Sequence, residues 1–256
     1  MQQVIHPHTG KLMTVEQYMQ QYPNALLNNP NYQPPLMICP HCSNQNMVLR
    51  ARSSISVPPY FAHPRNFGYC PSQENREGIY RGYRIQNPDP NNAEILRDHF
   101  KDYWRHYFKK LRQLVPYLRK EEFTRLIDIA NEERIWEYRN VEPYHIPYLL
   151  VTLADFPIQK PDVYYKTEYC RKLYFRYWFN THHNNYESIF ENIREVSLCR
   201  ASYKLDGRER MPIPERLMKT LRINVDNDLL QQDIEDISLS VENWVNRYFE
   251  LRNWGV

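Results

Sequence analysis

The chain has 256 residues, of which 42% are hydrophobic and 14% aromatic, which provides enough apolar surface for a folded core and excludes a disordered protein. Its net charge of +3 is small, so any nucleic-acid binding must come from local clusters of cations rather than from the whole chain. No stretch approaches the roughly 20 apolar residues of a membrane span, so we expect no membrane association. With six glycines, the sequence contains neither a phosphate-binding loop nor a dinucleotide-binding fingerprint, which argues against nucleotide-dependent enzymes.

The first 90 residues are rich in proline and in turns that contain asparagine, which excludes long helices. One short helix is predicted from Thr14 to Tyr22, with Thr14 as its N-terminal cap. The run from Asn87 to Asn92 has the composition of a linker. We therefore expect two domains, residues 1–90 and residues 91–256.

Beyond the linker the hydrophobic pattern becomes helical. Between residues 93 and 115 apolar side chains recur every three or four positions, which predicts one amphipathic helix. The same reasoning predicts further helices at 121–138, 167–179 and 186–200, one beginning near Pro214, and a last one over 227–253 that is either continuous or broken near Ser238. The apolar stretch 146–156 fits a strand or a short buried helix.

Three of the five cysteines lie within 32 residues, as Cys39, Cys42 and Cys70, and His63 lies between the last two. A Cys-x-x-Cys turn presents two thiolates to one tetrahedral ion, and His63 and Cys70 would complete a Cys₃His set. Such a set leaves no position open for water, so we expect a structural Zn²⁺ ion and no catalysis at this site. The spacing from Cys42 to His63 leaves room for a β-hairpin formed by residues 47–52 and 56–61.

Other interpretations of these side chains are weaker. His41 competes with His63 as a ligand, but its place inside the Cys-x-x-Cys turn makes simultaneous ligation awkward. Free thiols in a reducing cytosol are the alternative to zinc, yet a proline-rich segment of this size has few other means of stabilisation. Cys170 and Cys199 lie in predicted helices and are expected to be core thiols. The predicted fold class is therefore mainly α, with a small Cys₃His zinc-binding β-hairpin module followed by a helical domain.

The Cys-Pro-x-Cys turn, the segment 60–63 (Tyr-Phe-Ala-His) and Cys70 together resemble the N-terminal zinc region of the competence protein CoiA-like family of bacteria. The resemblance covers roughly residues 1–100 and includes the turn 7–10 (Pro-His-Thr-Gly). In that family a restriction-endonuclease-like nuclease domain follows, so the resemblance implies DNA-linked work in a bacterial cytoplasm. The second half departs from the pattern: 161–163 (Pro-Asp-Val) is similar to the family's Pro-Asp step, but no Glu-x-Lys or Glu-x-Gln strand follows.

Five cations recur on the predicted helix 93–115 at four- and three-residue spacing: Arg97, Lys101, Arg105, Lys109 and Arg112. On a helix they fall within about 120° of arc, opposite the apolar face, where they would contact a phosphate backbone. A solvated helix face is the alternative, because charge runs usually have that role. The aromatic and basic run 164–179 has the composition to stack bases, although core packing is the stronger interpretation.

These observations predict a non-catalytic, zinc-stabilised bacterial protein that binds nucleic acid or a nucleic-acid-processing partner, in DNA uptake or phage defence. A diverged metal-dependent nuclease is one alternative, but the sequence offers no set of carboxylates and a lysine that would converge on Mg²⁺. A protein-docking subunit of a defence complex is the other, since a long aromatic-rich helical half suits an interface.

Overall fold

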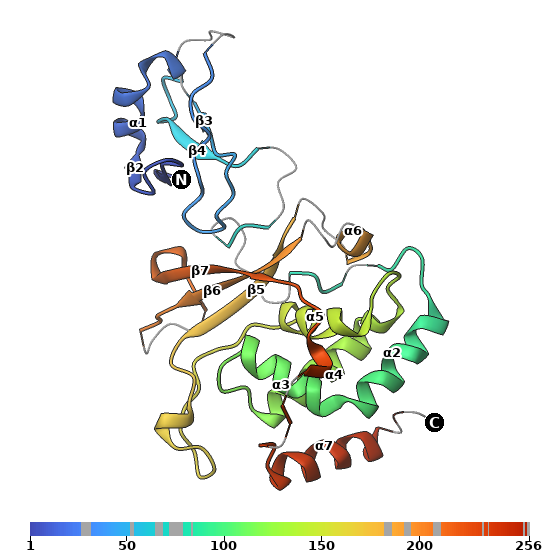
Figure 1. Cartoon of the computed structure of the whole chain (residues 1–256). Coiled ribbons are helices and arrows are strands. Elements are labelled where there is room, and N and C mark those ends of the chain that lie inside the picture. The colour runs from blue at the N-terminus through green and yellow to red at the C-terminus, as the bar shows by residue number, and fades with distance from the viewer. Residues whose placement is uncertain are drawn as a thin grey trace.

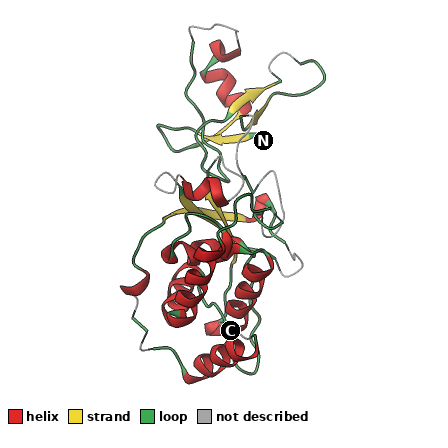
Figure 2. Cartoon of the chain, turned by 90° about the vertical axis from the view of Figure 1, so that its right-hand side faces the viewer, coloured by secondary structure: helices red, strands yellow, loops and turns green. Residues whose placement is uncertain are grey.

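The computed structural model describes most of the chain, and the description below is confined to those residues. They are 1–26, 32–51, 54–64, 69–71, 79–82, 84–181, 186–191, 196–206, 211–231, 233–234, 236–252 and 254. An N-terminal lobe, residues 1–64, stands on one side of a small sheet, and helices of the C-terminal lobe, which begins at residue 84, lie on the other (Figures 1 and 2). Within these ranges every helix is too short or too polar to cross a bilayer.

The N-terminal lobe begins with two short antiparallel strands, β1 (Gln3–Ile5) and β2 (Leu12–Thr14), joined by the predicted turn. Helix α1 (Val15–Gln21) follows at once, and Thr14 caps it as predicted. The Thr14 hydroxyl accepts the backbone N–H of Gln17 at 3.3 Å, and the Gln17 side chain accepts the N–H of Thr14 at 2.9 Å. This reciprocal pair satisfies two backbone donors that would otherwise lack partners.

The predicted hairpin is present but shorter than expected. Strands β3 (Val48–Arg50) and β4 (Tyr60–Ala62) pair antiparallel. The second strand begins at Tyr60 rather than at residue 56 because Pro58 and Pro59, directly before it, have no N–H to donate to a ladder. The last predicted residue of the first strand, at 52, lies outside the described residues.

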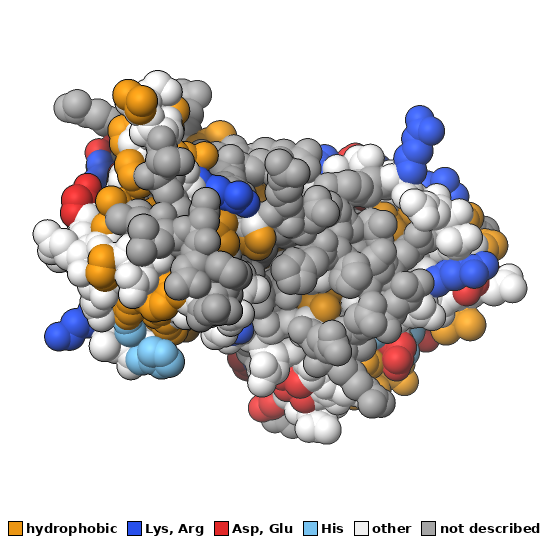
Figure 3. All heavy atoms as spheres, turned by 90° about the horizontal axis from the view of Figure 1, so that it is seen from above, with side chains coloured by type: hydrophobic (Ala, Val, Ile, Leu, Met, Phe, Trp, Pro, Cys, Tyr) orange, Lys and Arg blue, Asp and Glu red, His pale blue; other side chains and the backbone are white. Residues whose placement is uncertain are grey.

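The exposed residues of the N-terminal lobe are mostly uncharged, and some of them are hydrophobic. Figure 3 looks onto this lobe and shows hydrophobic side chains gathered there. Three hydrophobic residues of the lobe, Leu12, Leu36 and Ile55, are more than half exposed. Among its described residues the lobe carries two lysine or arginine side chains, Lys11 and Arg50.

The predicted helix 93–115 is two helices, α2 (Pro90–Asp102) and α3 (Trp104–Leu114), which separate at Tyr103. The predicted helix 121–138 ends early: α4 (Lys120–Glu132) stops before Arg134, which has the left-handed φ of 55°. The apolar stretch 146–156 contains a short buried helix, α5 (Ile146–Thr152). The last pattern is broken near Ser238, after which α7 (Leu239–Leu251) begins.

The fold class is mixed α/β, and the prediction of a mainly α protein is wrong. Strands β5 (Tyr174–Asn180), β6 (Ser197–Tyr203) and β7 (Leu217–Asn224) form an antiparallel sheet in the order β5-β6-β7. Strand β5 covers residues 174–179 of the segment predicted as helix 167–179, and β6 covers residues 197–200 of the segment predicted as helix 186–200. The start of the predicted helix 186–200 is helical, as the short helix α6 (Tyr186–Glu191). Near Pro214 a single turn of 3-10 helix leads into β7.

Strand β5 resembled a helix because both of its faces are buried, so its apolar residues do not alternate with polar ones. On one face Trp178 packs against Tyr69 with ring centroids 5.6 Å apart. On the other, the Tyr177 hydroxyl donates to the carbonyl of Leu114 at the end of α3. Aromatic residues are favoured in strands, and for β5 this preference indicates the observed structure better than the hydrophobic pattern does.

The charged residue in the middle of β5 is neutralised within the fold. Arg176 Nε donates to Asp155 Oδ1 at 2.9 Å, and the two side chains are 2% and 4% exposed. The Tyr174 hydroxyl also donates to Asp155, and Arg176 Nη1 donates to the Tyr69 hydroxyl at 3.3 Å. Arg176, one of the cations of the aromatic and basic run 164–179, is therefore part of the core.

Candidate metal centre

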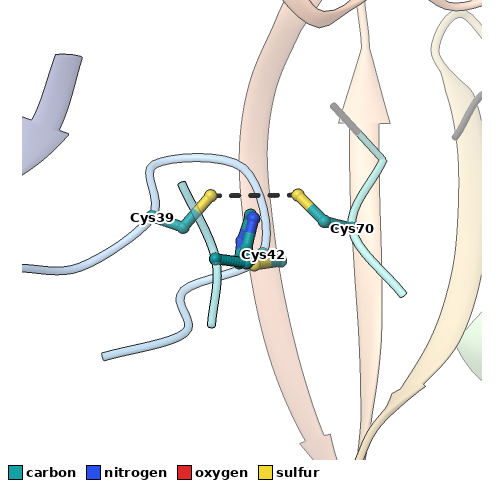
Figure 4. Close-up of side chains that lie close together, drawn as sticks. Cys39, Cys42 and Cys70 are labelled. Atoms are coloured by element: carbon teal, nitrogen blue, oxygen red, sulfur yellow. Dashed lines mark hydrogen bonds between the residues drawn. The ribbon is translucent and has the colours of Figure 1, made fainter. Parts of the chain in front are cut away.

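The predicted clustering of Cys39, Cys42, His63 and Cys70 is confirmed, and together they form a buried Cys₃His group that could hold a metal ion. Their ligand atoms all lie within 4.8 Å of one another. Cys39 Sγ is 3.9 Å from Cys70 Sγ, and Cys42 Sγ is 3.2 Å from His63 Nε2. In Figure 4, Cys39 and Cys70 face each other from separate segments of the chain.

The first two ligands are presented by a tight turn. A bridge between Met37 and Met47 closes its base. Ser43 N–H donates to the carbonyl of Cys39 at 2.9 Å, and Ser43 has a left-handed φ of 59°. The backbone N–H of His41 donates to Cys39 Sγ at 3.4 Å. Such a turn directs both sulfur atoms to one point and offers the first a hydrogen bond that favours its thiolate form.

The other two ligands are fixed by neighbouring structure. His63 directly follows β4, whose pairing with β3 sets its position. Cys70 follows Tyr69, which is held by Arg176 and Trp178 of β5. The ligand set is thus built partly from the N-terminal lobe and partly from a segment that packs on the C-terminal sheet.

Burial and contact with neighbouring thiols raise the pKa of Cys39 and Cys42 and favour their protonated forms. The hydrogen bond with Cys42 lowers the pKa of Cys39, but contact with Cys70 and burial outweigh it and raise that pKa to about 12. The pKa of Cys42 is raised further, because it contacts both other thiols and is buried. An ion that binds here has to displace these protons, so binding strengthens as pH rises.

The donor set fits a small tetrahedral ion. Zn–S and Zn–N bonds of about 2.3 and 2.1 Å give ligand-to-ligand edges of about 3.5 to 3.8 Å. The separations of 3.9 and 3.2 Å lie close to that range. His41 does not belong to the group, which agrees with the choice of His63 from the sequence.

The turn that carries Cys39 and Cys42 is hydrogen-bonded to the C-terminal sheet. Thr220 Oγ1 donates to the carbonyl of His41 at 2.8 Å, and Arg222 Nη2 donates to the carbonyl of Ser43 at 3.0 Å. Both donors lie on β7, at the edge of the sheet. Neither residue was identified from the sequence, because β7 itself was not predicted.

The predicted stripe of cations is divided between α2 and α3 and partly neutralised. Arg105 Nε donates to Glu242 at 2.8 Å, and Lys109 pairs with Asp236. Arg97 donates to Asn131 and lies over the ring of Trp254, 5.3 Å from its centroid.

Of the other two cations of the stripe, Arg112 lies over the ring of Phe108, 5.8 Å from its centroid. Within the described residues, Lys101 and Arg112 make no ion pair. They lie on different helices, Lys101 on α2 and Arg112 on α3.

The aspartate that resembled a nuclease residue organises a loop. The Asp162 carboxylate accepts the backbone N–H groups of Tyr164 and Tyr165 at 2.8 and 2.9 Å, and also Arg119 at 3.0 Å. These hydrogen bonds, above all the one from Tyr164, lower the pKa of Asp162. In the described part of the chain, the Cys₃His cluster is the group of three or more His, Cys, Asp and Glu that could hold a metal ion.

The remaining cysteines lie apart from the cluster. Cys170 is buried and its thiol donates to the carbonyl of Lys166 at 3.3 Å. Cys199 lies on strand β6 rather than in a helix, and burial raises its thiol pKa to about 12. Both are core thiols, as expected.

Comparison with known proteins gives no match: neither a protein-family model, a curated protein nor a solved structure matches this chain.

Proposed function

We propose that the chain is a zinc-stabilised, non-catalytic protein that binds nucleic acid through its C-terminal lobe. The proposal has two parts, a structural Zn²⁺ ion at the Cys₃His group and a phosphate-binding surface, and different observations support them.

Zinc is supported by the chemistry of the donor set. Three thiols and one imidazole nitrogen form a soft tetrahedral set, which suits Zn²⁺ better than Mg²⁺ or Ca²⁺. With four protein ligands the ion has no coordination position left for water, so its role would be to stabilise the fold. When bound, it would hold together two lobes that otherwise meet through few hydrogen bonds at this point.

Nucleic-acid binding is supported by the stripe cations that the fold does not neutralise. Lys101 and Arg112 make no ion pair within the described residues, and Lys120 follows close to Arg112 with a serine hydroxyl as its partner. Among its described residues the N-terminal lobe carries few cations, so phosphate contacts are expected on the C-terminal lobe. The resemblance of residues 1–100 to CoiA-like proteins favours DNA-linked work, in DNA uptake or defence within a bacterial cytoplasm.

The test is a fluorescence-anisotropy titration of zinc-loaded protein with labelled duplex and single-stranded DNA and RNA, with and without Mg²⁺. We expect binding without cleavage. Lys101→Glu combined with Arg112→Glu should weaken binding about tenfold for unrelated sequences, since phosphate contacts carry no sequence information. For duplex DNA, the slope of log affinity against log salt concentration should become shallower by about 1.8, because two phosphate contacts are lost.

The matched control is Lys172→Glu combined with Lys219→Glu, which makes the same change in charge at two exposed lysines away from the stripe. This control variant should bind nucleic acid with nearly the affinity of the parent protein. Equal weakening in both double variants, or no binding by the parent, would contradict the proposal. Cleavage by the parent would replace it with the nuclease alternative.

A further inference from the structure

A pocket of about 530 Å³ opens where the end of α3 meets the starts of α4 and α7. Its volume lies in the range of roughly 300 to 1,000 Å³ that small-molecule sites occupy. Its lining comes from three regions that are far apart in the sequence: the end of α3 with the start of α4, the loop at Tyr164 and Tyr165, and the start of α7. In Figure 1, helices α3 and α7 and the loop 157–171 all lie in the lower half of the molecule.

The pocket combines cations with aromatic rings. Lys120 Nζ lies 5.0 Å from the centroid of the Trp244 ring, and the Arg112 guanidinium lies 5.8 Å from that of Phe108. Arg112 makes no ion pair in the described chain, and Lys120 donates to the hydroxyl of Ser240 at 2.9 Å. Both cations thus remain available to a phosphate.

Two of the rings are exposed although they are large and apolar. Tyr164 is 89% exposed and Trp244 is 43% exposed. Tyr164 is not on a loose loop, because the Asp162 carboxylate accepts its backbone N–H and that of Tyr165. The adjacent ring of Tyr165 carries the Arg119 guanidinium 4.3 Å from its centroid. The backbone therefore holds an exposed aromatic face at the mouth of the pocket.

The start of α7 adds polar groups. Ser238 is the N-cap residue of this 13-residue helix, and its side chain makes no capping hydrogen bond. Ser238 and Ser240 both line the pocket, at the positive end of the helix dipole. Glu121 is acidic and also lines it, so the two cations exceed the acidic lining by one charge.

We propose that this pocket binds an unstacked base and its adjacent phosphate from a single-stranded nucleic acid. This inference rests on the proposed function and names the form of nucleic acid that it takes. Exposed rings beside cations match a base next to a phosphate, and such stacking is tolerant of sequence. In a duplex the bases are stacked on each other, so the rings of the pocket cannot reach their faces.

The first experiment measures affinity for labelled single strands of DNA and RNA and for a duplex, using zinc-loaded protein. Tyr164→Ala should weaken single-strand binding about tenfold or more and change duplex binding less than twofold. Tyr169→Ala is the matched control, since Tyr169 lies on the same loop, is 60% exposed and does not line the pocket. The DNA and RNA arms show which nucleic acid is preferred.

The second experiment uses the fluorescence of Trp244. The other tryptophans of the described chain are buried, so a base stacked in the pocket should quench the exposed one most. Single strands should quench the parent protein, and Trp244→Phe should remove most of that quenching.

The outcomes separate the two proposals. Equal affinity of Tyr164→Ala and the parent for single strands, or quenching that persists in Trp244→Phe, would overturn the pocket proposal. Phosphate binding through Lys101 and Arg112 would still stand if their substitution weakened duplex binding. Absence of any nucleic-acid binding by the parent would overturn both.

Discussion

Each ligand of the candidate metal centre has a local cause for its position. A turn with a left-handed Ser43 presents Cys39 and Cys42, and a strand end presents His63. Cys70 is placed by its neighbour Tyr69, which contacts the C-terminal sheet. The four ligand atoms therefore lie within reach of one ion.

At this scale we predict that the purified protein contains one Zn²⁺ per chain and that Cys42→Ser lowers the zinc content well below half an equivalent. Removing one thiolate leaves three ligands and opens the site to water. Elemental analysis of protein never exposed to a chelator measures both values. Cys170→Ser is the control and should keep the full equivalent; equal loss of zinc in both variants would mean that the ligands are wrongly assigned.

At the scale of elements, α3 acts as the connector of the C-terminal lobe. Its Lys110 is buried, with a side chain 7% exposed, and Lys110 Nζ donates to Asp226 at 2.7 Å and to Asp228 at 2.5 Å. Burial lowers the pKa of Lys110, but these hydrogen bonds outweigh burial and raise it. The helix is thereby joined to the segment that follows β7.

The acidic partner makes this connection sensitive to pH. Burial raises the pKa of Asp226, but its hydrogen bonds with Asp228, Lys110 and Tyr148 outweigh burial and lower that pKa to about 2. Because the pKa of Asp226 is lower in the folded state, its ionised form stabilises the fold at pH values above the unfolded pKa of about 3.8. This stabilisation is lost as the pH falls towards 2. The contribution is reduced by solvent, since the Asp226 side chain is 50% exposed.

We therefore predict that the free energy of unfolding falls between about pH 5 and pH 2, and that Asp226→Asn makes this fall shallower while lowering stability at neutral pH. Urea denaturation at a series of pH values measures the free energy of unfolding of both proteins. Asp98→Asn is the control, because Asp98 makes no ion pair within the described residues. Loss of zinc at low pH affects all three proteins alike; identical slopes for Asp226→Asn and the parent would contradict the prediction.

At the scale of the whole molecule, the metal site and the contact between the lobes are one structure. The turn that carries two ligands accepts hydrogen bonds from Thr220 and Arg222 on β7. The segment that carries Cys70 packs on β5 through Tyr69. A change that weakens the contact between the lobes is therefore expected to weaken metal binding as well.

Thr220→Val tests this coupling without touching a ligand. Losing one hydrogen bond of about 1 kcal/mol should leave the zinc stoichiometry unchanged but speed the transfer of zinc to a chelator about fivefold. Stopped-flow measurement with a coloured chelator gives the rate. Lys219→Gln, an exposed neighbour on the same strand, should transfer zinc at the parent rate. Equal rates in Thr220→Val and the parent would show that the lobes and the metal site are independent.

The sequence by itself determined the features that depend on residue type and short spacing. The Cys-x-x-Cys turn with His63 and Cys70, and the cap at Thr14, were identified because their chemistry is local or is limited to few residue types. The segment of α2 and α3 was predicted as one amphipathic helix, because one face of it meets solvent and leaves a period in the pattern; the break at Tyr103 was not predicted.

Only the tertiary structure decided the sheet and the state of the charged stripe. Strand β5 is buried on both faces and therefore has no alternation from which a strand could be distinguished from a buried helix. Arg105 meets Glu242 across 137 positions, and Lys109 meets Asp236 across 127. No local pattern encodes partners at such distances, because they are brought together by the packing of whole elements. The pocket at the start of α7 exists for the same reason.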